Sequence, residues 1–233
     1  TVLMTHFLTE GAVSPETIAN EALLLVVGAG VGVGMNLYIP GKREWIRGQQ
    51  LRIEERFREL FLEMAAYLQG ETRGEKIAEC LSGLSGMLDE GEAAAYLDME
   101  NTPVSETGDD LRYMVLRKSQ LAVLIRISDH LQRREAFPKQ AKWLSGLMRS
   151  VSRSFHEYNN ALGLLDELAG VKGELGREAL PATREEFEAR AILFQVLLEL
   201  EEFLRMKREF VAELTAEEIG EFWKNDVGSR DRG

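Results

Sequence analysis

The feature that most constrains this chain is the apolar run LLLVVGAGVGVGMNLYIP, residues 23–40. Such a run can be a strand that leads into a phosphate-binding loop, or a membrane helix. A dinucleotide-binding loop needs glycine at its first, third and sixth positions. The sixth position is Val33 when the pattern starts at Gly28, and Met35 when it starts at Gly30. No Gly-Lys-Ser/Thr follows, so the P-loop pattern fails as well.

Read as a helix, the same run places its glycines in two pairs four residues apart. Small residues at this spacing let a second helix approach closely in lipid. We therefore predict a helix-packing role for four positions: Gly28, Gly30, Gly32 and Gly34.

The length of the run fits a membrane crossing. Residues 22–39 contain only two polar groups, Asn36 and the Tyr38 hydroxyl, and as a helix they would span about 27 Å, close to the hydrocarbon thickness. We predict a transmembrane helix over residues 18–40. The alternative is a buried helix of a soluble core, in which each glycine would cost about 1 kcal/mol of helix propensity.

The distribution of charge predicts an orientation for this helix. Residues 1–41 contain no Lys or Arg, whereas basic residues crowd the next segment. By the positive-inside rule the segment after residue 41 is cytoplasmic, where anionic lipid attracts basic side chains. The basic residues in question are Lys42, Arg43, Arg47, Arg52, Arg56 and Arg58.

Composition limits the partners and the chemistry of the rest. The 233 residues carry a net charge of −11, of which −3 belongs to residues 1–41, so −8 remains for the following segment. An acidic domain does not suggest nucleic acid as a partner. Cys80 is the single cysteine, so an intrachain disulfide or a multi-thiolate metal site is impossible, as expected for a cytosolic domain.

From Arg43 onward the apolar residues repeat at helical spacing, and no segment alternates every two residues as a strand does. The fold class is therefore all-α, with one N-terminal transmembrane helix followed by a cytoplasmic antiparallel bundle of about five to six helices. We predict this bundle over residues 41–224 and a disordered tail over 225–233. Residues 1–17 read as the end of a preceding membrane segment and an external loop.

Capping signals predict where helices begin. Three Ser/Thr-x-x-Glu boxes stand before apolar runs, at Thr72–Glu75, Thr183–Glu186 and Thr215–Glu218. The helix after Thr183 has the most regular apolar stripe and should be central to the domain. The stretch AGVKGELGREALPA, residues 169–182, has three glycines and a proline and predicts a break.

No pattern of catalytic or metal-binding residues emerges. His6, His130 and His156 lie far apart and outside any metal-binding motif, so we expect no metal, no cofactor and no enzyme activity. Asn159 and Asn160 are unusual in what reads as a helix interior. They fit a polar bridge between helices or, less simply, a functional contact.

Two segments, together with the apolar run, resemble a known family. LPATREEFEARAILFQVLLELEEFLRMKREF (residues 180–210) and SFHEYNNALGLLDEL (154–168) are similar to late helices of bacterial aromatic acid exporter family proteins, a group related to fusaric acid resistance proteins. LLLVVGAGVGVGMNLYIP resembles their last membrane helix. The resemblance runs over nearly the whole chain, and the Thr-Arg-Glu-Glu-Phe-Glu segment is its most specific part.

The resemblance implies the C-terminal part of an inner-membrane exporter of aromatic carboxylic acids, whose helical cytoplasmic domain serves assembly or regulation. Its expected partners are the lipid bilayer, the remaining membrane helices of the same protein and further copies in a homo-oligomer. Asn36 is a candidate transport-pathway residue, because a polar group in a membrane helix must face protein or a cavity; interhelical hydrogen bonding is the alternative. The competing hypothesis for the whole chain is a membrane-tethered helical scaffold that binds a cytosolic partner without transport.

Overall fold

The computed structural model describes residues 15–38, 42–101, 108–134, 136–155 and 161–214. All regular secondary structure in these ranges is helical, which confirms the all-α class. The chain divides into two compact units, residues 1–42 and 43–233. Each unit is described separately below.

The first unit contains one described helix, α2 (Pro15–Tyr38), as the apolar run predicted. The large apolar side chains described in it are exposed, from Val27 at 53% to Leu25 at 73%. Within the part of the chain that the structure describes, no helix combines the length and hydropathy needed to cross a membrane. The transmembrane helix predicted over residues 18–40 is thus not confirmed.

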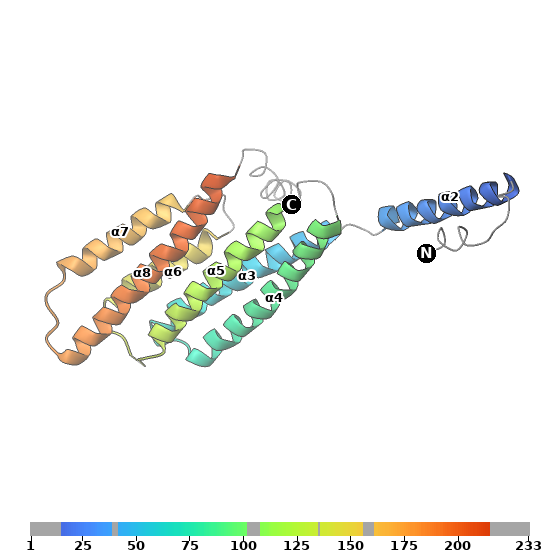
Figure 1. Ribbon diagram of the computed structural model, residues 1–233. Coiled ribbons are helices and arrows are strands. Elements are labelled where there is room, and N and C mark those ends of the chain that lie inside the picture. Colours follow the sequence, from blue (N-terminus) through green and yellow to red (C-terminus); the bar gives the residue numbers. More distant parts are fainter. Residues whose placement is uncertain (1–14, 39–41, 102–107, 135, 156–160, 215–233) are drawn as a thin grey trace, which may run out of the picture. The chain divides into compact units, whose positions relative to one another are not determined.

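The second unit is a bundle of six described helices in two layers (Figure 1). One layer has the order α4, α5, α8, α7, and α3 and α6 lie behind it. Helices of the bundle that follow one another in the chain are antiparallel (Figure 1). The helices α3 and α5 run parallel, as shown by the hydrogen bonds Gln50–Asp110 near their starts and Tyr67–Arg134 near their ends. The helices are α3 (Lys42–Tyr67), α4 (Gly74–Asn101), α5 (Gly108–Leu131), α6 (Ala141–Arg153), α7 (Leu162–Arg177) and α8 (Arg184–Glu213).

The core contains four phenylalanine rings, which come from α3, from α8 and from the segment after α6. Phe57 of α3 stacks on Phe155, which follows α6, with ring centroids 5.3 Å apart. Phe203 of α8 meets Phe61 edge-on at 5.2 Å. All four rings are at most 3% exposed, and aromatic pairs of this kind add about 0.5–1.5 kcal/mol each beyond burial. The prediction that α8 is central is confirmed, since its apolar stripe from Leu193 to Val211 is buried.

Two helix boundaries form as their sequences require. After α3, Gly70 has a φ of +73°, and its N–H and that of Glu71 donate to the carbonyls of Tyr67 and Ala66, which is the Schellman arrangement. At the start of α8, Thr183 Oγ1 accepts from the Glu186 N–H at 3.1 Å. Glu186 reaches back to the N–H of Ala182, one residue earlier than the usual box.

Other boundary predictions are wrong. Among the described residues Thr72 Oγ1 has no hydrogen-bond partner, so no capping box starts α4. The break predicted over 169–182 begins too early, because α7 continues through three glycines, Gly170, Gly173 and Gly176, to Arg177. Added Cβ atoms there would meet described atoms no closer than 4.0 Å, so these glycines are not required by close packing within the described residues.

The segment 154–168 is not one helix, contrary to the prediction. The helix α6 ends at Arg153 with Ser154 as its C-cap, and α7 starts after Ala161, which takes a left-handed φ of 60°. Asn159 and Asn160 lie outside the described residues, as do Thr215–Glu218, the predicted tail over 225–233, His6 and His156.

Candidate functional site

Three of the predicted packing glycines of α2 have no close neighbour within their own unit. A Cβ at Gly28, Gly30 or Gly32 would meet nothing within 4 Å. The side-chain positions of Gly34 and Asn36 lie outside the described residues. The packing role of these glycines stays a prediction.

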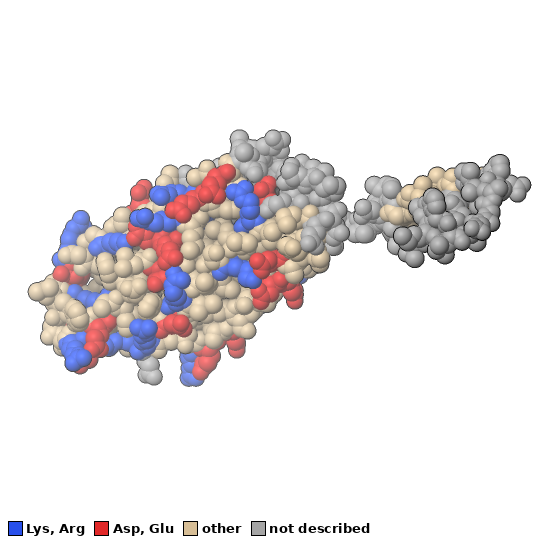
Figure 2. All heavy atoms as spheres, in the orientation of Figure 1, with Lys and Arg blue, Asp and Glu red and all other residues tan. Residues whose placement is uncertain are grey.

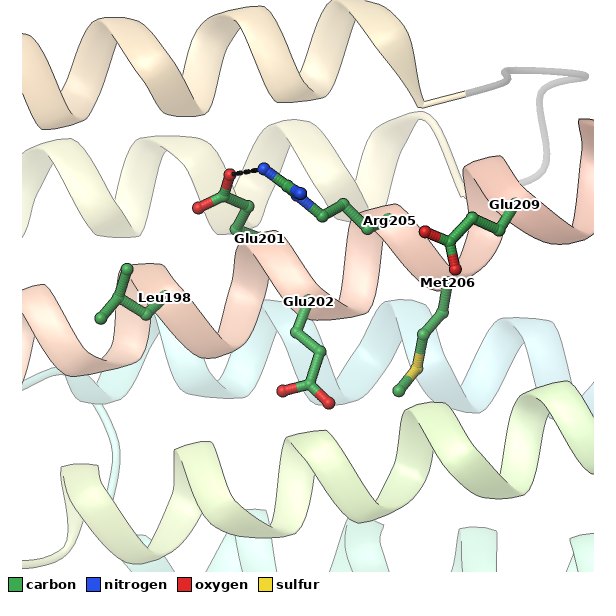
Figure 3. Close-up of a pocket in the computed structure, with 6 residues that line it drawn as sticks. All are labelled: Leu198, Glu201, Glu202, Arg205, Met206 and Glu209. Carbon is green, nitrogen blue, oxygen red and sulfur yellow. Dashed lines mark hydrogen bonds and ion pairs between the residues drawn. The ribbon is translucent and has the colours of Figure 1, made fainter.

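A groove of about 430 Å³ follows the outer side of α8 (Figure 3). It carries three carboxylates, and two of them already have cationic partners. Glu201 binds Arg205 at 2.6 Å and also Lys172 of α7, and Glu202 binds Arg126 of α5 at 2.7 Å. Hydrogen bonds from Lys172, which has the larger effect, and from Arg205 lower the pKa of Glu201. The lining residues are Leu198, Glu201, Glu202, Arg205, Met206 and Glu209.

These ion pairs connect the groove residues of α8 to α7 and α5. The acidic and basic side chains on this face of the bundle are interspersed, as Figure 2 shows, and do not gather by sign. A charge-balanced groove on one helix offers no strong field to an ionic ligand. We assign it no binding role.

The most unusual chemistry lies inside the bundle, around Arg117 of α5. Its side chain is 4% exposed. One terminal nitrogen donates to Glu54 Oε1 of α3 at 2.9 Å and the other to Gln120 Oε1 at 2.8 Å. The Tyr113 hydroxyl donates to the same Glu54 oxygen at 2.7 Å, and Gln120 donates to the Phe203 carbonyl at 3.1 Å. We call Glu54, Tyr113, Arg117 and Gln120 the Arg117 cluster.

Aromatic faces surround the Arg117 guanidinium. Its central carbon lies 4.5 Å from the ring centroid of Phe155, 4.9 Å from that of Tyr113 and 5.6 Å from that of Phe57. A second buried cation, Lys207 of α8, lies with Nζ 5.7 Å from the Phe155 centroid. Cations over ring faces gain about 2 kcal/mol when desolvated. The site therefore pairs positive charge with aromatic surface.

Burial and neighbours set the protonation states of this cluster. Burial lowers the pKa of Arg117, but Tyr113 and Glu54 raise it by more, so the guanidinium stays charged. Burial also raises the pKa of Tyr113 far above its usual value, so the phenol stays neutral and acts as a donor. Among the described residues, Arg117 Nε is buried and has no hydrogen-bond acceptor.

Sequence reasoning missed this cluster, although it leaves a signal. Tyr113, Arg117, Gln120 and Leu124 stand at helical spacing on the inner side of α5. A charged residue within an apolar stripe is the sign of a buried ion pair. His130 lies at the α5–α8 interface, 3.9 Å from Glu199, as expected for a polar group between helices. Within the described residues no group of acidic, His and Cys side chains could hold a metal.

Comparison with protein families gives a match over most of the second unit. The family model described as "Putative aromatic acid exporter C-terminal domain" matches residues 44–208. This range contains SFHEYNNALGLLDEL and nearly all of the late-helix segment that carried the resemblance, whereas the apolar run at 23–40 lies before it.

A relative and a solved structure extend this finding. The "Uncharacterized protein YqjA" of Bacillus subtilis (strain 168) is 31% identical over 212 residues, which are 90% of this chain and 65% of that protein. The chain thus spans about two thirds of the length of its relative. The crystal structure of a "putative membrane protein from Clostridium difficile 630" matches with a TM-score of 0.63 and 26% identity, over 72% of this chain and 99% of that one.

Proposed function

Because the chain belongs to the aromatic acid exporter C-terminal domain family, we propose that it is the C-terminal part of a bacterial plasma-membrane exporter of aromatic carboxylic acids. The family match over residues 44–208 is the observation that carries this proposal. The bundle would be a cytoplasmic domain that serves assembly or regulation. No catalytic step is part of the proposal.

The exposed apolar surface of α2 supports a membrane location. Five consecutive large side chains from Leu23 to Val27 are each more than half exposed. Soluble monomers rarely leave a contiguous surface of this kind uncovered. Lipid and the remaining helices of the exporter would cover it, with the glycines at the closest approach. Asn36 would then face a neighbouring helix or the transport pathway.

The experiment compares export in cells. Strains that lack or overproduce the intact protein are loaded with a panel of aromatic carboxylates, and retained and released acid is measured. The proposal expects accumulation, or growth inhibition, in the deletion strain and faster release on overproduction. Unchanged release of every acid in both strains would contradict export and favour the membrane-tethered scaffold.

A further inference from the structure

We propose that the outer face of α8 binds a second copy of this chain, with the two α8 helices antiparallel. The inference rests on the proposed function in one respect, because it names the surface through which the bundle serves assembly. Its physical argument comes from α8 alone. The contact is made by a row of six residues that we call the α8 seam: Arg184, Phe187, Ala191, Phe194, Leu198 and Glu201.

The apolar middle of the α8 seam is exposed in the bundle. Phe187 is 62% exposed, Phe194 47% and Leu198 39%, and Ala191 between them is also exposed. The two phenylalanines alone leave about 200 Å² of apolar surface open, at about 150–250 Å² for a whole aromatic side chain. A contiguous apolar row of this kind is typical of an interaction surface.

The spacing of the α8 seam predicts that its partner is a helix. Its residues are alternately three and four positions apart, from Arg184 to Glu201. This is the a/d spacing of a coiled coil, in which two helices pack side by side. The broader stripe that α8 buries in the core lies on the other side of the helix. The narrow exposed row therefore fits one further helix.

The order of residues makes the α8 seam complementary to itself in the antiparallel direction. When the midpoint of the pair falls between Ala191 and Phe194, Ala191 faces Phe194 of the second copy, so a small side chain accommodates a large one. Phe187 then faces Leu198. At the two ends Arg184 faces Glu201. Apolar residues thus meet in the middle of the seam, and opposite charges meet at both ends.

A parallel pair of the same helices lacks this complementarity. Each residue would face its own copy, so Arg184 would meet Arg184 and Glu201 would meet Glu201, and contacts between like charges are unfavourable. Within its own bundle Arg184 also pairs with Glu188, and Glu201 pairs with two cations of α7 and α8. The end charges therefore set the direction of the pair more than its strength.

The size of the contact predicts a reversible dimer. Specific interfaces bury about 1,200–2,000 Å² in total, of which about 56–58% is apolar. The phenylalanines of two copies supply about 400 Å² of apolar surface, and Leu198 and Ala191 add to it. The α8 seam thus lies at the small end of this range, so we expect the dimer to dissociate on dilution.

Disulfide cross-linking of the full chain in detergent tests the α8 seam. Phe187→Cys and Leu198→Cys are introduced together in a Cys80→Ser background, because Cys80 is the single cysteine of the chain. The two positions are eleven residues apart on one α8, about 16 Å along the axis, which is too far for a disulfide within the helix. In the antiparallel pair they face each other across the seam. Mild oxidation should therefore convert most of the protein to a covalent dimer.

Two controls measure cross-linking that does not depend on the seam. Phe187→Cys alone and Leu198→Cys alone should give little dimer, because in the antiparallel pair each position lies about 16 Å along the axis from its own copy. Leu51→Cys with Leu62→Cys is the matched pair on α3. These leucines are also eleven residues apart, and their exposed fractions of 64% and 43% are close to those of Phe187 and Leu198. The dimer yield of this pair measures random collision.

A charge in the middle of the seam tests its apolar contact. Phe194→Glu, added to the double-cysteine variant on α8, should lower the dimer yield at limiting protein concentration by at least about tenfold, because the contact would bury an unpaired carboxylate. Leu62→Glu in the same background should leave the yield unchanged, since Leu62 has a similar exposed fraction but lies on α3. Circular dichroism confirms the fold of each variant.

The outcomes separate this inference from the proposed function. A folded double variant on α8 that gives no more dimer than the α3 pair would overturn the seam and leave this face to another partner. As much dimer from a single variant as from the double variant would overturn the antiparallel pairing, and so would unchanged cross-linking in Phe194→Glu. Cross-linking without export leaves the seam standing and removes the exporter, whereas export without cross-linking does the reverse.

Discussion

The helices α2 and α8 are both rich in apolar residues, but α2 exposes these residues and α8 buries most of them. In α2 the leucines and valines from Leu23 to Val27 are 53–73% exposed. In α8 the residues at spacings of three and four, such as Leu193, Leu197 and Leu200, are at most 1% exposed, with charged residues between them. A periodic pattern lets a chain bury its own surface, whereas an unbroken run needs an environment supplied from outside.

Removal of residues 1–42 should give the largest effect. We expect the remaining bundle to stay dissolved in buffer without detergent and to be predominantly helical, because the apolar stripes of its helices pack on one another. The whole chain should need detergent. Sedimentation and circular dichroism check this, and a whole chain that stays monomeric in plain buffer would contradict the membrane assignment of α2.

Within α8, truncation of a buried ring tests the inward stripe. Phe203→Ala removes contacts with Phe57, Phe61 and Phe155 and should lower the free energy of unfolding by about 3–5 kcal/mol. Phe194→Ala, on the same helix but 47% exposed, should cost less than about 1 kcal/mol. Denaturant unfolding of the bundle measures both, and similar losses would show that the exposed face of α8 is also covered.

For α2 the corresponding change is Gly30→Leu. A Cβ at this position meets nothing within 4 Å, so a loss of stability would indicate a helix packed against it. We expect a loss of about 1–3 kcal/mol in association or stability in detergent, as in other overpacked contacts. The pairs Gly28–Gly32 and Gly30–Gly34 form ridges about 160° apart, so leucine should be tolerated differently on the two. A leucine scan that leaves oligomeric state and melting unchanged at all four positions would show that they face lipid.

A smaller effect is expected at the start of α8. Thr183→Ala removes the oxygen that accepts from the Glu186 N–H and should cost about 1 kcal/mol. Thr72→Ala is the comparison, because Thr72 Oγ1 caps no helix among the described residues. Thermal melts of the two variants should differ by a few degrees, and equal melting temperatures would mean that the Thr183 bond contributes nothing net.

The sequence predicted what depends on local pattern. Apolar period was enough to predict a helical bundle and the helix that follows Thr183, and Thr183 caps as its spacing indicates. Thr72 has the same spacing but forms no cap. The local sequence could not show this, because it does not show how tertiary packing places the Thr72 side chain. The start of α7 was not predicted either. Ala161 adopts a left-handed conformation there, which is uncommon for a residue other than glycine.

The Arg117 cluster could not be assembled in advance for a related reason. Its hydrogen-bonded partner Glu54 lies 63 residues away, and many Glu and Arg residues alternate along both helices. Only the parallel register of α3 and α5 selects this pair. The helical stripe of α5 shows that Arg117 must be buried, but it does not show which carboxylate meets it.

The aromatic core closed by Phe57 and Phe203 has a consequence for synthesis of the chain. Phe57 on α3 leaves the ribosome 146 residues before Phe203 on α8, the ring it packs against. At roughly 5–20 residues per second this interval is about 7–30 s. Throughout it the inner face of α3 lacks its contacts with α8. The yield of folded protein should therefore depend on elongation rate and temperature during expression, and not on the stability of the finished bundle alone.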